Sequence, residues 1–128
     1  MPEPVFVALL IADRVITEDN QKKAIIGTFT QFTVHQLPAA LPPWFIYAAV
    51  TNLAGEHAFS VNLVFDRSQQ VVFSAGGKIS VDDPRRVVEL VIQVPNVVFP
   101  EEGTYDMLFH IDGDPIGSRI LDVVKAGQ

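Results

Sequence analysis

Short segments in which apolar and polar residues alternate recur along this chain, with clusters of turn residues between them. The clearest segment covers residues 103–113, where apolar side chains occupy the odd positions from Tyr105 to Ile111. A period of two predicts a strand with one face in a core. The chain also has 18 Val and 10 Ile against 9 Leu, and stiff β-branched side chains pack well on a pleated sheet. The sequence therefore predicts an all-β fold.

The length and composition predict one globular domain. The chain has 128 residues, of which 48% are hydrophobic and 19% are charged. A chain of this size buries a core without disulfides or metal. We expect a single domain over residues 1–128, with a core over about 5–124 and a frayed tail at 125–128.

Charge and cysteine content exclude several classes of protein. The net charge is −6 and the chain has no cysteine. Nucleic acids and anionic membranes select for Lys and Arg patches, so we expect neither as a partner. The lack of cysteine excludes a disulfide scaffold and a thiolate metal site.

The apolar run at residues 5–12 resembles the core of a signal peptide, but Glu3 precedes it where a basic residue is typical, and Asp13 follows it at once. The run is too short to span a bilayer. We interpret it as a buried first strand and expect a cytoplasmic location.

The alternation predicts about eight to ten strands, over residues 5–13, 24–34, 44–53, 57–66, 70–75, 78–81, 87–94, 103–112 and 116–124. Gly27 inside the second of these indicates a bulge or a close backbone approach, and the pair Gly76-Gly77 indicates a hairpin turn. The proline-rich segment 37–43 cannot join a ladder, so we expect it to cross between two sheets. These features favour an antiparallel β-sandwich.

Two further segments bear on the fold. Asp83 could cap a helix with Pro84 in its first turn, but the alternation and β-branching of residues 87–94 favour a strand. Tyr105 follows a proline and a glycine at a corner, as does the tyrosine that fixes the corner of immunoglobulin-like sandwiches. We therefore predict an immunoglobulin-like sandwich and a structural role for Tyr105.

Several short motifs together resemble an uncharacterised bacterial family known only as a domain of unknown function. The motifs lie at residues 8–13, 18–20, 25–29, 100–105 and 112–113, and the resemblance spans roughly residues 7–124. One departure is Gln21, which stands where glycine is expected in the first turn. The resemblance implies a small immunoglobulin-like sandwich and supplies no catalytic residues.

No constellation of residues indicates a metal site, a cofactor or catalysis. His35, His57 and His110 lie far apart without the spacing of zinc ligands. Acidic turns would favour calcium only if they clustered in space, and the residues concerned are Glu18, Asp19, Asp82, Asp83, Asp112 and Asp114. No nucleophile motif is present, so we expect no enzyme, no cofactor and no metal.

Residues 44–50 are apolar on both faces, unlike a sheet with one wet face. Either this is a central strand covered on both sides, or its outer face binds a partner. On the second alternative we predict an interaction surface of Trp44, Tyr47 and Phe99, with a homodimer as its simplest form. The most favoured function is a non-enzymatic protein-interaction or structural module that binds through a sheet face, a sheet edge or end loops. The alternative is a small-ligand or carbohydrate binder that uses Trp44 and Tyr47.

Overall fold

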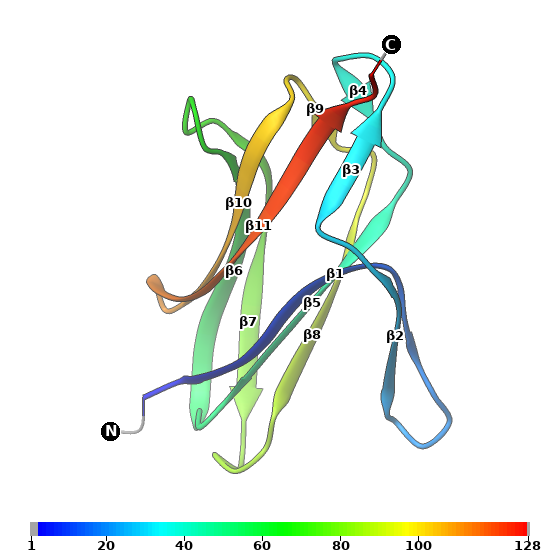
Figure 1. Ribbon diagram of the computed structural model, residues 1–128. Helices are drawn as coiled ribbons and strands as arrows, with labels where there is room; N and C mark the ends of the chain where they lie inside the picture. The colour runs from blue at the N-terminus through cyan, green and yellow to red at the C-terminus, as the bar shows by residue number, and fades with distance from the viewer. Residues whose placement is uncertain (1–2, 128) are drawn as a thin grey trace.

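The computed structural model describes residues 3–127, which form eleven strands and no helix (Figure 1). The all-β prediction is thereby confirmed. The strands are β1 (Val5–Thr17), β2 (Lys23–Thr28), β3 (Gln31–Val34), β4 (Ala39–Ala40), β5 (Trp44–Thr51), β6 (Gly55–Phe65), β7 (Val71–Val81), β8 (Val88–Val94), β9 (Val98–Phe99), β10 (Gly103–Ile111) and β11 (Asp114–Lys125).

The strands form two main sheets that lie as two layers in Figure 1. The four-stranded sheet has the order β2-β1-β5-β8, and the five-stranded sheet has the order β3-β11-β10-β6-β7. A small third sheet pairs β4 with β9. Among the described residues the pairings are antiparallel, except that β3 runs parallel to β11.

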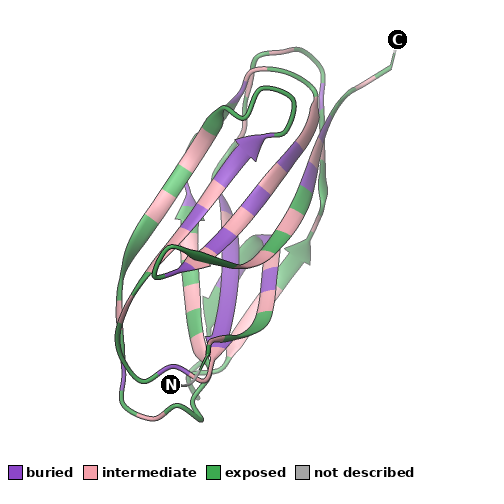
Figure 2. Cartoon of the chain, turned by 90° about the vertical axis from the view of Figure 1, so that its left-hand side faces the viewer, coloured by how far each residue is buried: buried purple, intermediate pink, exposed green. Residues whose placement is uncertain are grey.

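One hydrophobic core lies between the two sheets. Ile11 and Ile46 enter it from the four-stranded sheet, and Leu63 and Met107 enter it from the five-stranded sheet. Each of the four is at most 2% exposed. Burying such a side chain stabilises the fold by about 1.5–3 kcal/mol. Figure 2 shows buried positions alternating with more exposed ones along the strands, as a period of two requires.

The predicted strand at residues 24–34 is in fact two strands in different sheets. β2 belongs to the four-stranded sheet and β3 to the five-stranded sheet, and the chain crosses between them at Phe29 and Thr30. At Gly27 the prediction was a bulge or a close backbone approach, but the pairing of β1 with β2 has no register shift, and the near neighbour is a side chain. The φ of Gly27 is +72°, and an added Cβ would lie 3.0 Å from the Asp13 carboxyl carbon. The N–H of Phe29 donates to the carbonyl of Ile11, and the chain leaves the four-stranded sheet after this bond.

The hairpin predicted at Gly76-Gly77 is wrong, because β7 runs straight through both residues. Neither glycine has the positive φ that a tight hairpin turn favours. Both instead leave room for Phe59 of β6: a Cβ would lie 2.9 Å from its carbonyl oxygen at Gly76 and 3.1 Å from its ring at Gly77. The two glycines are explained by the close approach of β6 to β7, which requires glycine just as a tight turn does.

The segment 37–43 leads from β3 to β5 and so crosses between the sheets, as predicted. The expectation that it joins no ladder is wrong, because Ala39 and Ala40 pair with β9. The predicted buried first strand is buried only in part, since residues 5–7 of β1 are exposed. Residues 88–94 form a strand, and Asp83 accepts a hydrogen bond from the N–H of Arg85 in a turn before it. The frayed tail predicted at 125–128 is wrong for its first two residues, since Lys125 pairs with Val34 and the N–H of Ala126 donates to the carbonyl of Val34. Gln128 lies outside the described residues.

Candidate functional site

The three residues predicted as an interaction surface do not share one. Trp44 is 2% exposed and Phe99 is 0% exposed, and both lie in the core between the sheets. Tyr47 lies on the opposite face of β5. The reason is the position of β5 between β1 and β8, where its even-numbered residues face the core. The prediction of a surface at Trp44 and Phe99 is therefore wrong.

Tyr47 lies on the outer face of the four-stranded sheet but is itself 9% exposed. It packs in a second apolar cluster with Ala12 and Ala49, and its hydroxyl donates a hydrogen bond to Glu89. Burial, together with the hydrogen bond and the charge of Glu89, raises the pKa of Tyr47 to about 12. The outer face of β5 is therefore covered largely by other side chains of this protein. This agrees with the alternative of a central strand that is covered on both sides.

One histidine meets a carboxylate. His57 Nδ1 lies 2.6 Å from Asp112 Oδ2, and His57 Nε2 lies 2.9 Å from the carbonyl oxygen of Ala54. These bonds raise the pKa of His57, the bond to Asp112 having the largest effect, and the same bond lowers the pKa of Asp112. Both ring nitrogens are occupied, so this pair offers no free base to a substrate.

The histidines and the acidic turns do not assemble further. Within residues 3–127, no group of three or more His, Asp or Glu side chains could hold a metal ion. Asp112 also accepts a hydrogen bond from the N–H of Ala58, so its carboxylate links the turn between β10 and β11 to β6.

The most distinctive feature of the surface is a pair of strand edges that face each other without a strand between them. β2 pairs with β1 only from Ala12 onward, and β3 pairs with β11 only from Asp122 onward. The earlier part of β1 and the middle of β11 are therefore edges. They lie on the same side of the molecule, where β1 and β11 contact each other.

The backbone groups that point out of this part of β11 follow from its pairing with β3. The N–H of Asp122 donates to the carbonyl of Thr30, so Asp122 points toward β3. Alternate residues of a strand point their backbone groups the same way. Ser118 and Ile120 therefore direct an N–H and a carbonyl each into the space below β3, where no described strand pairs with them.

Three adjoining hollows occupy this space, and all three are lined by Arg119. We call them together the edge groove. Their volumes are about 300, 450 and 370 Å³. Besides Arg119, the first hollow is lined by Leu10, Ile11, Thr28, Phe29 and Thr30. The second is lined by Thr30, Ser118, Ile120 and Asp122. The third is lined by Phe6, Val7, Ala8, Leu9, Leu10 and Ser118.

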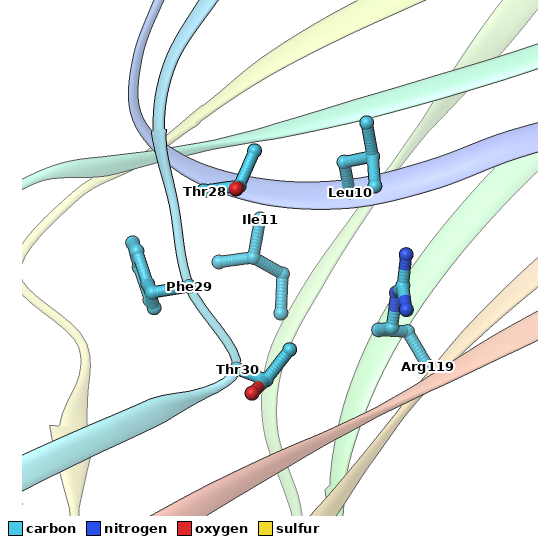
Figure 3. Close-up of a pocket in the computed structure, with 6 residues that line it drawn as sticks. All are labelled: Leu10, Ile11, Thr28, Phe29, Thr30 and Arg119. Atoms are coloured by element: carbon cyan, nitrogen blue, oxygen red, sulfur yellow. The ribbon is translucent and has the colours of Figure 1, made fainter.

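Arg119 is the central residue of the edge groove. It is in phase with the buried Leu121 and Val123, so its side chain points inward from β11, and Figure 3 shows it reaching toward β1. Its Nε–H donates to the carbonyl of Leu9 at 2.8 Å. No carboxylate of the described residues lies within 4.0 Å of its guanidinium. The fork of N–H donors therefore keeps capacity for an anion.

The sequence interpretation missed Arg119 and the edge groove. The available signal was an arginine among inward positions of an alternating strand, between Gly117 and Leu121. A charged residue in an inward series indicates an open edge, because a closed core does not hold an unpaired charge.

The geometry defines an all-β protein of two packed sheets in which one edge of β11 is free before Asp122. The chain belongs to a family of unknown function, DUF6941, whose model matches residues 7–124. The predicted resemblance to a family of unknown function, over roughly the same span, is thereby confirmed. No curated protein matches the chain. The described part of the chain contains no helix that could cross a membrane.

Proposed function

We propose that this protein is a non-enzymatic interaction module that binds an extended segment of a partner protein along the free edge of β11. The observation that carries the proposal is the pair of outward-pointing residues, Ser118 and Ile120, beside the edge groove. Unpaired backbone donors and acceptors on a strand edge are a template for another strand. β3 already uses this template from Asp122 onward, so a guest strand would continue its row.

The fold that presents the edge is, on our proposal, an immunoglobulin-like sandwich. In support of this, the Tyr105 hydroxyl donates to the carbonyl of Glu101 at 2.6 Å, which is the hydrogen bond of a tyrosine corner. Burial raises the pKa of Tyr105. The bacterial origin of the family and a cytoplasmic location stay predictions from the sequence.

The absence of an enzymatic role is part of the proposal. The one histidine–carboxylate pair described above has both ring nitrogens bonded within the protein. The alternative of a small-ligand site at Trp44 and Tyr47 is not favoured, because both side chains are buried and neither lines the edge groove.

The test removes one backbone donor from the edge. Ser118→Pro deletes the outward N–H, whereas Ser118→Ala keeps it and removes only the hydroxyl, so the two variants form a matched pair. Tagged wild-type protein and both variants would be used to capture proteins from lysate, with quantitative mass spectrometry, after thermal unfolding has shown that all three are folded.

We expect at least one protein to be captured by the wild type and by Ser118→Ala and to be lost with Ser118→Pro. A second copy of this chain, captured with the same dependence, would identify self-association through the edge. Capture that is unchanged by the proline, or no specific capture at all, would overturn the proposal.

A further inference from the structure

We infer that the edge groove recognises the carboxyl terminus of its partner, taking the last three or four residues. This inference rests on the proposed function and names the class of partner for the same site. It follows from where the groove ends, from the direction of its neighbour strand and from the charge inside it.

The groove is closed at both ends. At its upper end, β3 occupies the position beside Asp122, and Thr30 leads into it. At its lower end, the Phe6 ring covers Gly117, where a Cβ would lie 2.6 and 2.8 Å from two ring carbons. Four residues of β11, 118–121, remain between these ends. At about 3.3 Å per residue they span roughly 13 Å, which is room for three or four guest residues.

The direction of a bound peptide relative to β3 determines which end of the peptide lies beside Thr30. β3 runs parallel to β11, so a guest in the same row and direction runs toward Thr30. It cannot continue past Thr30, because β3 occupies the next position. A guest in this direction therefore ends there with its terminal carboxylate, whereas a guest in the opposite direction would bring its amino terminus to the same point.

The charge of the groove selects between these two directions. Arg119 and Thr30 line the same cavity, and Figure 3 shows both among its lining residues. Asp122 lines the adjoining hollow, but it is out of phase with the inward Leu121 and Val123. Its carboxylate accepts a hydrogen bond from Thr104 Oγ1. The guanidinium is anchored through Nε to the carbonyl of Leu9, which leaves its terminal N–H groups for a carboxylate. A terminal ammonium would meet a cation instead. In a chain of net charge −6, this unpaired arginine is a local site for an anion.

The cavity at Arg119 has a mixed lining that is mainly polar where it is exposed. Leu10 and Phe29 line it together with the hydroxyl-bearing Thr28 and Thr30, while Ile11 is almost fully buried. Its volume of about 300 Å³ is at the lower limit of ligand pockets, and suits one terminal residue with its carboxylate. The lining therefore favours the carboxylate itself over one kind of terminal side chain.

The test uses synthetic pentapeptides of one sequence that differ only in the last residue: Val, Ile, Leu, Phe, Ser, Asp or Lys. Each is made twice, as the free acid and as the amide, and binding is measured by isothermal titration calorimetry and by amide shifts in ¹⁵N spectra of the whole chain. We expect the acids to bind at least tenfold more tightly than their amides, with shifts at Ser118 and Ile120, and the series of last residues to show which side chain the cavity accepts best.

Variants separate the charge from the edge. Arg119→Gln should remove the preference for the acid, and Arg119→Lys should keep part of it because the charge remains. Thermal unfolding of both variants shows whether loss of the bond to Leu9 has disturbed the fold. Ser118→Pro should weaken acids and amides alike.

The two proposals fail in different ways. Equal binding of acids and amides would overturn the inference about the carboxyl terminus, while sensitivity of that binding to Ser118→Pro would leave the strand-edge function intact. Binding of no peptide at about 1 mM would also overturn the inference. Lysate capture that ignores Ser118→Pro would overturn the proposed function itself.

Discussion

The contact between Phe6 and Gly117 closes the lower end of the edge groove, and its contribution to stability can be tested with one added methyl group. In Gly117→Ala the new Cβ would overlap the Phe6 ring. The backbone of Gly117 lies outside the left-handed region, so alanine is compatible with its conformation. The ring must therefore move while the strand stays in place.

The expected magnitude follows from the exposure of the ring. Phe6 is 39% exposed, so about three fifths of its side chain is buried. Full burial of Phe is worth about 1.5–3 kcal/mol, and displacing this ring therefore costs up to ~1–2 kcal/mol. Replacing Gly by Ala returns about 0.4–1 kcal/mol by restricting the unfolded chain. The net change in the wild type is a loss of roughly 0–1.5 kcal/mol.

A double-mutant cycle isolates the contact. In a Phe6→Ala background, Gly117→Ala should stabilise by about 0.4–1 kcal/mol, so the coupling energy should be ~1–2 kcal/mol. Urea unfolding can be followed through the single tryptophan, Trp44, which is buried. Val5→Ala serves as the control background. A coupling near zero with Phe6, or an equal coupling with Val5, would refute the reasoning.

Three further predictions concern stability. His57→Gln should destabilise the fold more at about pH 5.5 than at about pH 9, because the raised pKa of His57 means that its bond to Asp112 stabilises the fold below the unfolded value of 6.5 and is lost as pH rises through the folded pKa. Tyr105→Phe should cost ~1–2 kcal/mol, because the carbonyl of Glu101 loses its partner. Gln21→Gly should be more stable than Gln21→Ala by ~1 kcal/mol, since φ is +70° there.

Chemical unfolding at the stated pH values measures each of these. For the histidine, Asp112→Asn should show the same pH dependence, and a penalty that is equal at both pH values would contradict the charge argument. For the tyrosine, a loss below ~0.5 kcal/mol would mean that water replaces the hydroxyl. For Gln21, an alanine variant as stable as the glycine variant would show that the turn relaxes.

Alternation predicted much of this fold because a half-buried strand leaves a direct pattern. Tyr105 to Ile111 lie inward as the period of two requires, and Tyr105 makes the predicted corner bond. Pattern alone could not separate two uses of glycine. The pair Gly76-Gly77 predicted a turn, yet both are strand residues beside Phe59, whereas the positive φ lies at the single Gly27.

The candidate site could not be predicted for a different reason. Trp44 and Tyr47 suggested a surface because large side chains cover both faces of β5, but the position of a strand within a sheet is a property of topology. The edge groove depends on where β2 and β3 stop pairing with β1 and β11. The absence of a neighbouring strand beside β11 leaves no periodic pattern in the sequence. The only sign of it is Arg119, a charged residue among inward-facing positions.

The bond between Arg119 and Leu9 joins residues that are 110 positions apart. Contacts between residues so far apart form slowly, because the entropy cost of closing a long loop comes before the stabilising contact is made. β1 is synthesised before β11, so its free edge stays without Arg119 until β11 has emerged. The edge groove therefore forms only after both strands have been made, and on our proposal a partner segment binds only after that point.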